Sequence, residues 1–242
     1  MEKTVSEAIA YRRSTRVYKD TPIDTEKVKQ CIVNASLAPT SSNLQLWEFY
    51  HVTSEDKLKA LAEACFNQNA ASTAKQLVVV VTRKDLWRER AKANLDYLNK
   101  VYRDKDLSER DAKRKKMAMG YYKKVIPTIY TDFLGILGFV KYLAFQVVGL
   151  FRPIYRQTRQ SDMRIVAHKS AGLAAQNFMT SMAAIGYDTC PMEGSDTLRV
   201  KQILDLPRGS EINMVIGCGI RDDKGIYGPR FRVPFEDVYV EV

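Results

Sequence analysis

The sequence predicts an α+β fold in which a central sheet lies between layers of helices. An uninterrupted apolar, β-branched run at 77–81 is typical of a buried strand, and the largely apolar segment 212–220 is predicted to be another. Segments with the apolar spacing of helices alternate with them, above all 167–185. The chain of 242 residues is long enough for one substantial domain, and no repeat or linker-like segment divides it. We therefore expect a single domain over 1–242.

The first quarter of the chain is predicted to form two helices, a strand and a third helix. Thr4 to Glu7 fits a capping box, and a second helix is expected to begin after Asp24 and to end before Pro39. Residues 48–52 then have the pattern of a short strand. A further helix face is indicated by apolar side chains at Leu58, Leu61, Ala62 and Cys65.

The last third of the chain returns to this alternation. The long helix predicted over 167–185 is followed by a shorter one over 195–204 and by the buried strand over 212–220. Residues 238–242 are predicted to add a terminal strand. The sheet is thus expected to draw its strands from both ends of the chain.

A different segment separates the two alternating regions. Residues 88–124 contain thirteen Lys/Arg and six Asp/Glu, whereas 125–151 carry only Asp132 and Lys141 as charged residues. We interpret residues from about 96 to about 160 as a helical insertion, basic and then apolar. Its apolar stretch, 133–151, approaches the length of a membrane span but contains three glycines and has basic flanks. A lid or dimer-packing helix is the favoured interpretation, with peripheral membrane contact and a true span as alternatives.

The formal charge of +10 indicates an anionic partner, such as a phosphorylated cofactor, a nucleic acid or a membrane surface. Four cysteines without a CxxC pair and only two histidines leave little material for a metal site, and we expect none. The N-terminus has early charges and no apolar segment typical of a signal peptide. A cytoplasmic location is the expectation.

Three separated stretches carry residues suited to ligand binding. Residues 12–16, Arg-Arg-Ser-Thr-Arg, offer guanidinium groups that can bind phosphate bidentately, although a lone cluster of this kind is usually a solvated surface. Residues 38–47 form a loop rich in hydroxyl and amide groups, or an ordinary capped turn. Residues 190–196, Cys-Pro-Met-Glu-Gly-Ser-Asp, place backbone N–H groups before a predicted helix start.

These stretches, in this order and with Gly-Pro-Arg-Phe-Arg-Val-Pro at 228–234, resemble the nitroreductase family of flavoproteins. The resemblance covers the chain up to about residue 85 and its last third, and leaves out the insertion. It implies a three-layer fold with a mixed, mainly antiparallel sheet flanked by helices. It also implies an intertwined homodimer with FMN at the subunit interface.

The resemblance implies where the cofactor is held. Arg12, Arg13 and Ser14 would bind the FMN phosphate and ribityl chain, together with Arg230 and Arg232. Arg16 would lie near the pyrimidine end of the flavin, where a cation stabilises the reduced form. The second subunit would contribute four residues of the hydroxyl-rich loop: Pro39, Thr40, Ser41 and Asn43.

Two further groups are implied at the flavin ring. Asn67, with Gln68, matches the amide that bonds the pyrimidine edge. The turn formed by Pro191, Met192, Glu193 and Gly194 would bring the backbone amides of its last two residues to N5. Because the flavin carries the redox chemistry, no catalytic side chain is expected.

The sequence also departs from the family pattern. Leu46 stands where proline usually precedes the loop tryptophan, and Ala70 stands where some members have a lysine, with Lys75 further along. The departure at Leu46 bears on the stiffness of the loop. The departure at Ala70 bears on whether a second cation lies over the flavin.

The activity implied is ping-pong hydride transfer from NADH or NADPH through FMN to a nitroaromatic, a quinone or a related acceptor. Reductive dehalogenation or flavin fragmentation is an alternative within the same flavoprotein class. A non-catalytic basic protein that binds nucleic acid or a membrane surface through 88–124 and 133–151 is an alternative from another class. We expect no nucleic-acid partner, because a basic run of this kind is more often a solvated helix face.

Overall fold

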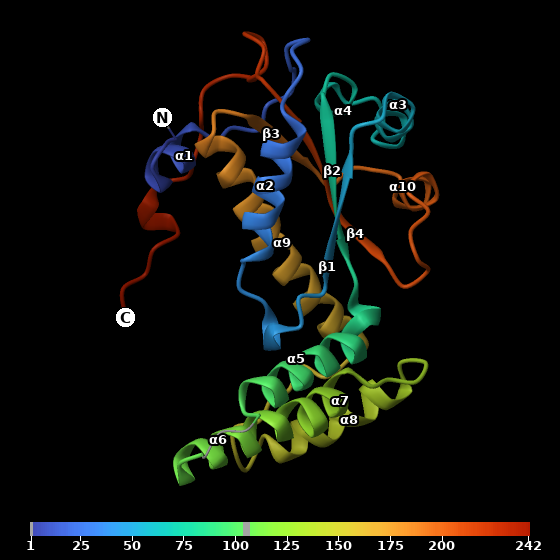
Figure 1. The fold of residues 1–242 in the computed structure, drawn as a ribbon, viewed down its shortest axis with the longest axis vertical. Helices are drawn as coiled ribbons and strands as arrows, with labels where there is room; N and C mark the ends of the chain where they lie inside the picture. Colours follow the sequence, from blue (N-terminus) through green and yellow to red (C-terminus); the bar gives the residue numbers. More distant parts are fainter. Residues whose placement is uncertain (1, 104–106) are drawn as a thin grey trace.

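The computed structural model describes residues 2–103 and 107–242 and has a layered body with a helical arm below it (Figure 1). Its sheet has four strands in the order β1-β2-β4-β3. All three pairings between these strands are antiparallel. The named strands thus form an antiparallel sheet, which confirms the mainly antiparallel character predicted. The parallel bridge between Ser14 and Thr189 is isolated and lies outside these strands. The strands are β1 (Trp47–Val52), β2 (Gln76–Thr82), β3 (Asp188–Met192) and β4 (Glu211–Gly219).

Helices cover both faces of this sheet. One face packs against α2 (Thr25–Ser36) and the long α9 (Gln160–Ala184), with α1 (Val5–Tyr11) lying against α9 (Figure 1). Phe178 and Met182 of α9 are completely buried there. The other face packs against α3 (Glu55–Ala64), α4 (Asn69–Ser72) and α10 (Thr197–Ile203). Both faces of β2 are buried, which explains its uninterrupted apolar sequence.

The predicted helix starts in the first quarter are confirmed. Thr4 and Glu7 bond each other reciprocally at the start of α1, and the Asp24 side chain accepts from two amides of α2. Short 3-10 turns lie at η1 (Ser41–Asn43), η2 (Lys84–Leu86) and η4 (Phe235–Asp237). The α9 helix starts seven residues before the apolar run suggests, because Asp162 accepts a hydrogen bond from the backbone N–H of Arg159 and caps its first turn.

Every element of regular secondary structure described between β2 and α9 is a helix. These elements include α5 (Trp87–Val101), α6 (Glu109–Gly120), a π-helix η3 (Tyr121–Val125), α7 (Ile126–Tyr130) and α8 (Ile136–Val148). Residue 96, the expected start of the insertion, lies within α5. A third core cluster, including Leu46, Trp87 and Ile126, joins this arm to the body. In the described ranges 2–103 and 107–242, we find no helix that combines the length and apolarity needed to cross a membrane.

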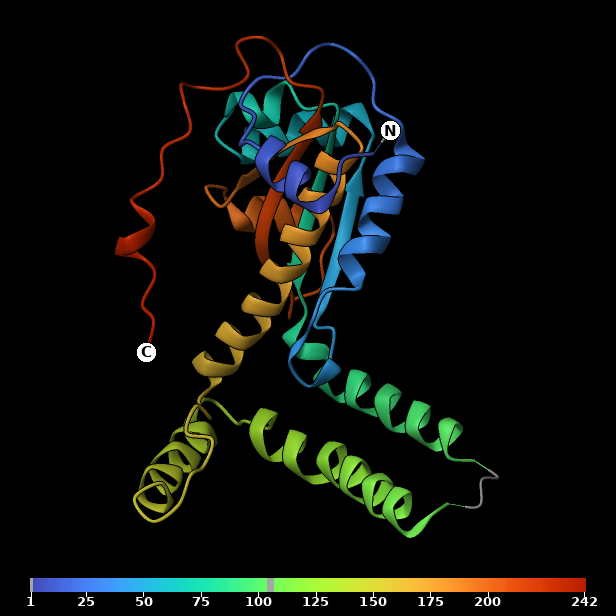
Figure 2. The same cartoon turned by 90° about the vertical axis from the view of Figure 1, so that its left-hand side faces the viewer.

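The predicted terminal strand at 238–242 is wrong. These residues form no strand and are exposed, and the C-terminal segment runs down one side, clear of the sheet (Figure 2). A strand needs a neighbour with free backbone groups, and the tail runs away from both edges of its own sheet.

Candidate functional site

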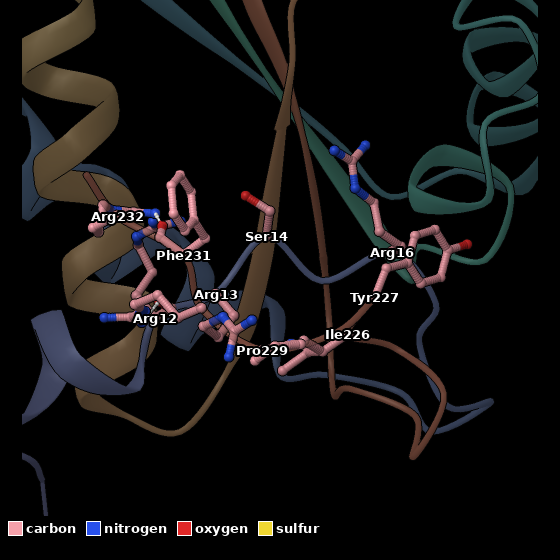
Figure 3. Close-up of a pocket in the computed structure, with 10 residues that line it drawn as sticks. Arg12, Arg13, Ser14, Arg16, Ile226, Tyr227, Pro229, Phe231 and Arg232 are labelled. Carbon is pink, nitrogen blue, oxygen red and sulfur yellow. Dashed lines mark hydrogen bonds between the residues drawn. The ribbon is translucent and has the colours of Figure 1, made fainter. Parts of the chain in front are cut away.

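The C-terminal end of α1 forms one wall of a cavity of about 270 Å³ (Figure 3). The opposite wall is the segment 226–232, from the far end of the chain. All six predicted phosphate-end and ring residues from these two stretches line it: Arg12, Arg13, Ser14, Arg16, Arg230 and Arg232. The structure therefore brings together two motifs that lie more than two hundred residues apart in the sequence.

Backbone carbonyls of the opposite segment hold two of these arginines in place. Arg230 donates to the carbonyls of Ala10 and Arg12 at 2.8 and 2.6 Å. Arg13 donates to the carbonyl of Gly228 at 2.9 Å, and Gly228 adopts a left-handed φ of 82°. The two chain segments are thus fixed against each other by their own cations, because each guanidinium uses part of its donor set on the opposite backbone.

The cavity has a strong excess of positive charge. Five of its ten lining residues are arginines, and no Asp or Glu is among the described residues that line it. Burial lowers the pKa of Arg12, and the neighbouring charges of Arg230 and Arg232 lower it further. Cations brought together without acidic partners repel one another, so the arrangement is suited to an anion with several acceptor oxygens.

Ser14 and Arg16 extend this cavity along the sheet. The Thr15 amide donates to the carbonyl of Thr189 at 3.1 Å, next to the parallel bridge at Ser14, which fixes the segment beside β3. Arg16 points away from Arg12 and Arg13 on the other side of Ser14 (Figure 3). The arginines therefore occupy two positions along one groove.

The turn after β3 is fixed by the helices on the second face. Pro191 and Met192 end β3, with Met192 buried, and Glu193 and Gly194 follow as exposed residues. The Gln68 amide donates to the carbonyl of Gly194 at 2.9 Å. Asp196 then caps α10, and its own N–H donates to the carbonyl of Ala64. The turn predicted to present backbone amides is thus anchored at both ends.

Asn67 and Gln68 have different surroundings. Gln68 contacts the turn at Gly194, whereas Asn67 has a φ of 50° and lines a separate cavity of about 580 Å³. Lys75 lines that second cavity as well, where it forms an ion pair with Asp20. Lys75 is therefore engaged elsewhere and does not replace the cation absent at Ala70.

The hydroxyl-rich loop lies at the other end of the body. Figure 1 places η1 near α5, whereas α1 and its arginines lie near the opposite end of α9. Pro39, Ser41 and Asn43 are exposed, and the Thr40 hydroxyl accepts from the amide of Gln45 at 3.1 Å. In one chain, therefore, the loop and the arginine cavity do not come together.

The loop is held in an unusual conformation. Ser42, Asn43 and Gln45 all have positive φ values, between 49° and 54°, although none is glycine. Such residues are costly unless their surroundings hold them. Leu46, at the position where the family pattern has proline, is buried in the core cluster shared with the arm, which anchors the end of the loop.

Residues of the arm supply further contacts of the loop. The Tyr121 and Ser42 hydroxyls hydrogen-bond at 2.7 Å, and the Tyr122 hydroxyl donates to the Ser42 carbonyl at 3.1 Å. Asn94 bonds both the carbonyl and the side chain of Asn43. Tyr121 and Tyr122 open the π-helix, a distortion that often marks functional sites.

Sequence reasoning missed these arm residues, as well as Tyr227, which lines the arginine cavity and accepts a hydrogen bond from Asn69. An asparagine or tyrosine on a charged helix has no local pattern that identifies such a contact.

Comparisons with known proteins concern the family and the fold of the chain. The family model described as "Nitroreductase family" matches residues 9–220. Protein DrgA of Synechocystis is 26% identical over 218 residues, covering 90% of this chain and 84% of DrgA. The ydfN crystal structure from Bacillus subtilis has a TM-score of 0.72 at 22% identity, with 98% of each chain covered. The NADPH:FMN oxidoreductase of Vibrio harveyi, solved with NAD+, has a TM-score of 0.61 at 18% identity, covering 98% of this chain and 76% of that one.

Proposed function

The chain belongs to the nitroreductase family, and on that premise we propose that it is an FMN-dependent oxidoreductase that takes its electrons from NADH or NADPH. The observation that carries the proposal is the cavity at the end of α1, which five arginines line without an acidic residue among its described lining. A phosphate group satisfies such a set because it offers several charged acceptor oxygens to forked donors.

The donor set fits the phosphate end of FMN in particular. Arg12, Arg13 and Ser14 would bind the phosphate and ribityl chain, with Arg230 and Arg232 on the opposite wall. A cation farther along the groove, Arg16, would lie towards the pyrimidine end of the ring system (Figure 3). The lowered pKa of Arg12 supports this proposal, because a bound dianion would relieve the repulsion among the three guanidiniums.

The residues near the ring would orient and shield it. We propose that the exposed turn of Pro191, Met192, Glu193 and Gly194 presents backbone N–H groups to the flavin ring, with Gln68 holding Gly194 in position. Asn67, which lines the second cavity, would bond the pyrimidine edge of the ring. When bound, FMN would supply the hydride chemistry between NAD(P)H and an acceptor such as a nitroaromatic or a quinone.

The site as proposed requires a second copy of the chain. Pro39, Thr40, Ser41 and Asn43 lie at the opposite end of the body from the arginines, so within one chain they cannot reach the same ligand (Figure 1). A two-fold homodimer would bring this loop from one subunit to the cavity of the other. The exposed apolar residues of the C-terminal tail, including Phe235 and Tyr239, would then pack on the partner.

Anaerobic reduction of the FMN-loaded protein tests the proposal. We expect NADH or NADPH to bleach the flavin absorbance in the absence of oxygen, and a nitroaromatic or quinone to restore it. Flavin that neither nicotinamide reduces would contradict the proposed electron source. Flavin that is reduced but is reoxidised only by halogenated substrates, or is itself consumed, would favour dehalogenation or flavin fragmentation instead.

A further inference from the structure

One face of α8 is apolar and exposed to solvent. Ile136, Phe139, Val140, Leu143 and Val147 recur at i, i+3, i+4, i+7 and i+11, so they lie on one side of the helix. All five are at least 40% exposed. The segment 133–151 contains no acidic residue and a single cation, Lys141. An exposed apolar surface of this length usually marks an interaction site.

The polar side of α8 faces its own chain. The Lys141 ammonium donates to three carbonyls at the end of α7, including that of Thr128 at 2.9 Å. Arg159 stacks on the ring of Tyr142, and Gly138 is buried with its N–H donated to Asp132. These contacts fix the rotation of α8 about its axis. The outward orientation of its apolar face is therefore set by packing within the chain.

The basic charge of the protein is concentrated around this helix. Residues 88–160, from α5 to the start of α9, contain seventeen Lys/Arg and seven Asp/Glu. Their net charge of +10 equals that of the whole chain, because the remainder has twenty-one residues of each sign. Lys113 and Lys116 on α6 and Arg152 after α8 are exposed. The part of the molecule with the apolar face is therefore the part that attracts anions.

This charge distribution decides between two occupants of the face. Two copies that met symmetrically at α8 would bring two strongly basic arms together, which electrostatic repulsion opposes. An anionic lipid surface provides both an apolar layer for the exposed side chains and negative headgroups for the flanking cations. With 13 residues, α8 is about 20 Å long, which suits a helix lying in the plane of the interface.

We propose that the α5–α8 arm docks the protein peripherally on anionic phospholipid membranes, with the exposed face of α8 inserted among the headgroups. Within one chain, this docking lies at the end away from the arginine cavity (Figure 1, Figure 2). It does not depend on the proposed redox function. It would place the enzyme where apolar acceptors dissolve.

Sedimentation with lipid vesicles tests the proposal. We expect the protein to bind vesicles of phosphatidylcholine with phosphatidylglycerol at least about tenfold more tightly than phosphatidylcholine alone, and added salt to weaken this binding. Absence of binding to the anionic vesicles, or equal binding to both kinds, would overturn the proposal.

Substitutions at two matched leucines distinguish the contribution of the α8 face to vesicle binding from the effect of adding an acid anywhere on the surface. Leu143→Asp on α8 and Leu198→Asp on α10 each place an acid at an exposed helical leucine, 49% and 64% exposed in the native chain. We expect Leu143→Asp to reduce binding to anionic vesicles at least about tenfold and Leu198→Asp to leave it within about twofold. Circular dichroism would establish that both variants keep the native helix content.

Two further measurements test the role of the basic residues and the alternative that a second copy of the chain covers the apolar face. Lys113→Gln with Lys116→Gln should weaken vesicle binding and its salt dependence while leaving the apolar face intact. Light scattering on wild type and Leu143→Asp would reveal a contact between copies. If Leu143→Asp lowers the oligomeric mass and leaves vesicle binding unchanged, the face joins two subunits and the membrane proposal is wrong.

Discussion

Asn43 and Asn94 are joined by two hydrogen bonds that run in opposite directions. The Asn43 side-chain amide donates to Asn94 Oδ1 at 2.9 Å, and the Asn94 amide donates to the Asn43 carbonyl at 3.0 Å. Asn43 belongs to the hydroxyl-rich loop and has a φ of 50°, whereas Asn94 lies in the middle of α5. The insertion thus holds a strained loop that we assign to the flavin site of the partner subunit.

Replacing Asn94 with alanine should loosen this loop. Two hydrogen bonds to Asn43 are lost, together worth about 1–3 kcal/mol, and the left-handed conformation of Asn43 loses its support. We expect the FMN dissociation constant to rise at least about fivefold, measured by fluorescence titration of the apoprotein. Asn99→Ala, at an exposed asparagine of the same helix, serves as the control and should leave FMN affinity unchanged. Equal affinity in the two variants would remove the loop from the flavin site.

Arg12→Ala should weaken FMN binding by removing a charge-assisted contact to the phosphate. The expected loss is about 1.5–3 kcal/mol, or roughly ten- to a hundredfold in the dissociation constant. Arg110→Ala removes an exposed arginine of α6 and controls for net charge. If both variants bind FMN like wild type, the arginines at the end of α1 are a solvated surface and the proposed site is wrong.

Gly228→Ala tests the wall formed by the C-terminal segment. A Cβ at this position meets no atom within 4 Å, so the only cost is the positive φ of 82°, about 1–2 kcal/mol. Since the Gly228 carbonyl accepts from Arg13, we expect weaker FMN binding and a lower thermal midpoint. Gly120→Ala is the matched control, because that glycine also has open space around it but helical backbone angles. The control should be neutral or slightly stabilising.

The buried cysteines predict a loss of stability in alkali. Burial raises the pKa of Cys31 and of Cys65 from the ordinary 9.0 to about 11. The folded state then keeps these protons while the unfolded state releases them, so their contribution is full below about pH 9 and declines towards pH 11. Urea unfolding at increasing pH should show this decline, about 1.4 kcal/mol per pH unit for each thiol.

The Cys31→Ala, Cys65→Ala double variant should show a shallower decline over the same range. An identical pH profile in wild type and double variant would mean that other groups cause the alkaline loss.

Local patterns predicted the parts of the fold that depend on local physics. The capping box at Thr4, the Asp24 cap and the buried β2 run all follow from residue type and spacing, and the structure confirms them. The terminal strand at 238–242 was wrong because strand formation depends on a neighbouring strand, and its apolar alternation cannot reveal whether one is present.

The candidate site likewise has some residues that local sequence identifies and others that depend on contacts between distant parts of the chain. The arginines of 12–16 and 230–232 were found by motif, but their convergence on one cavity became visible only in three dimensions. Asn94 and Tyr122 had no local signature, because their role depends on contacts with a loop some 50 and 80 residues earlier. The insertion was recognised by its charge and apolarity, whereas its hold on the loop was not.

Comparison of FMN with riboflavin tests the central claim most directly, because the two ligands differ only in the phosphate that the arginine cavity is proposed to bind. Titration of the apoprotein should show FMN binding at least about tenfold tighter than riboflavin, with the advantage reduced in Arg12→Ala. Failure to bind FMN, or equal affinity for both ligands in the wild-type protein, would contradict the account.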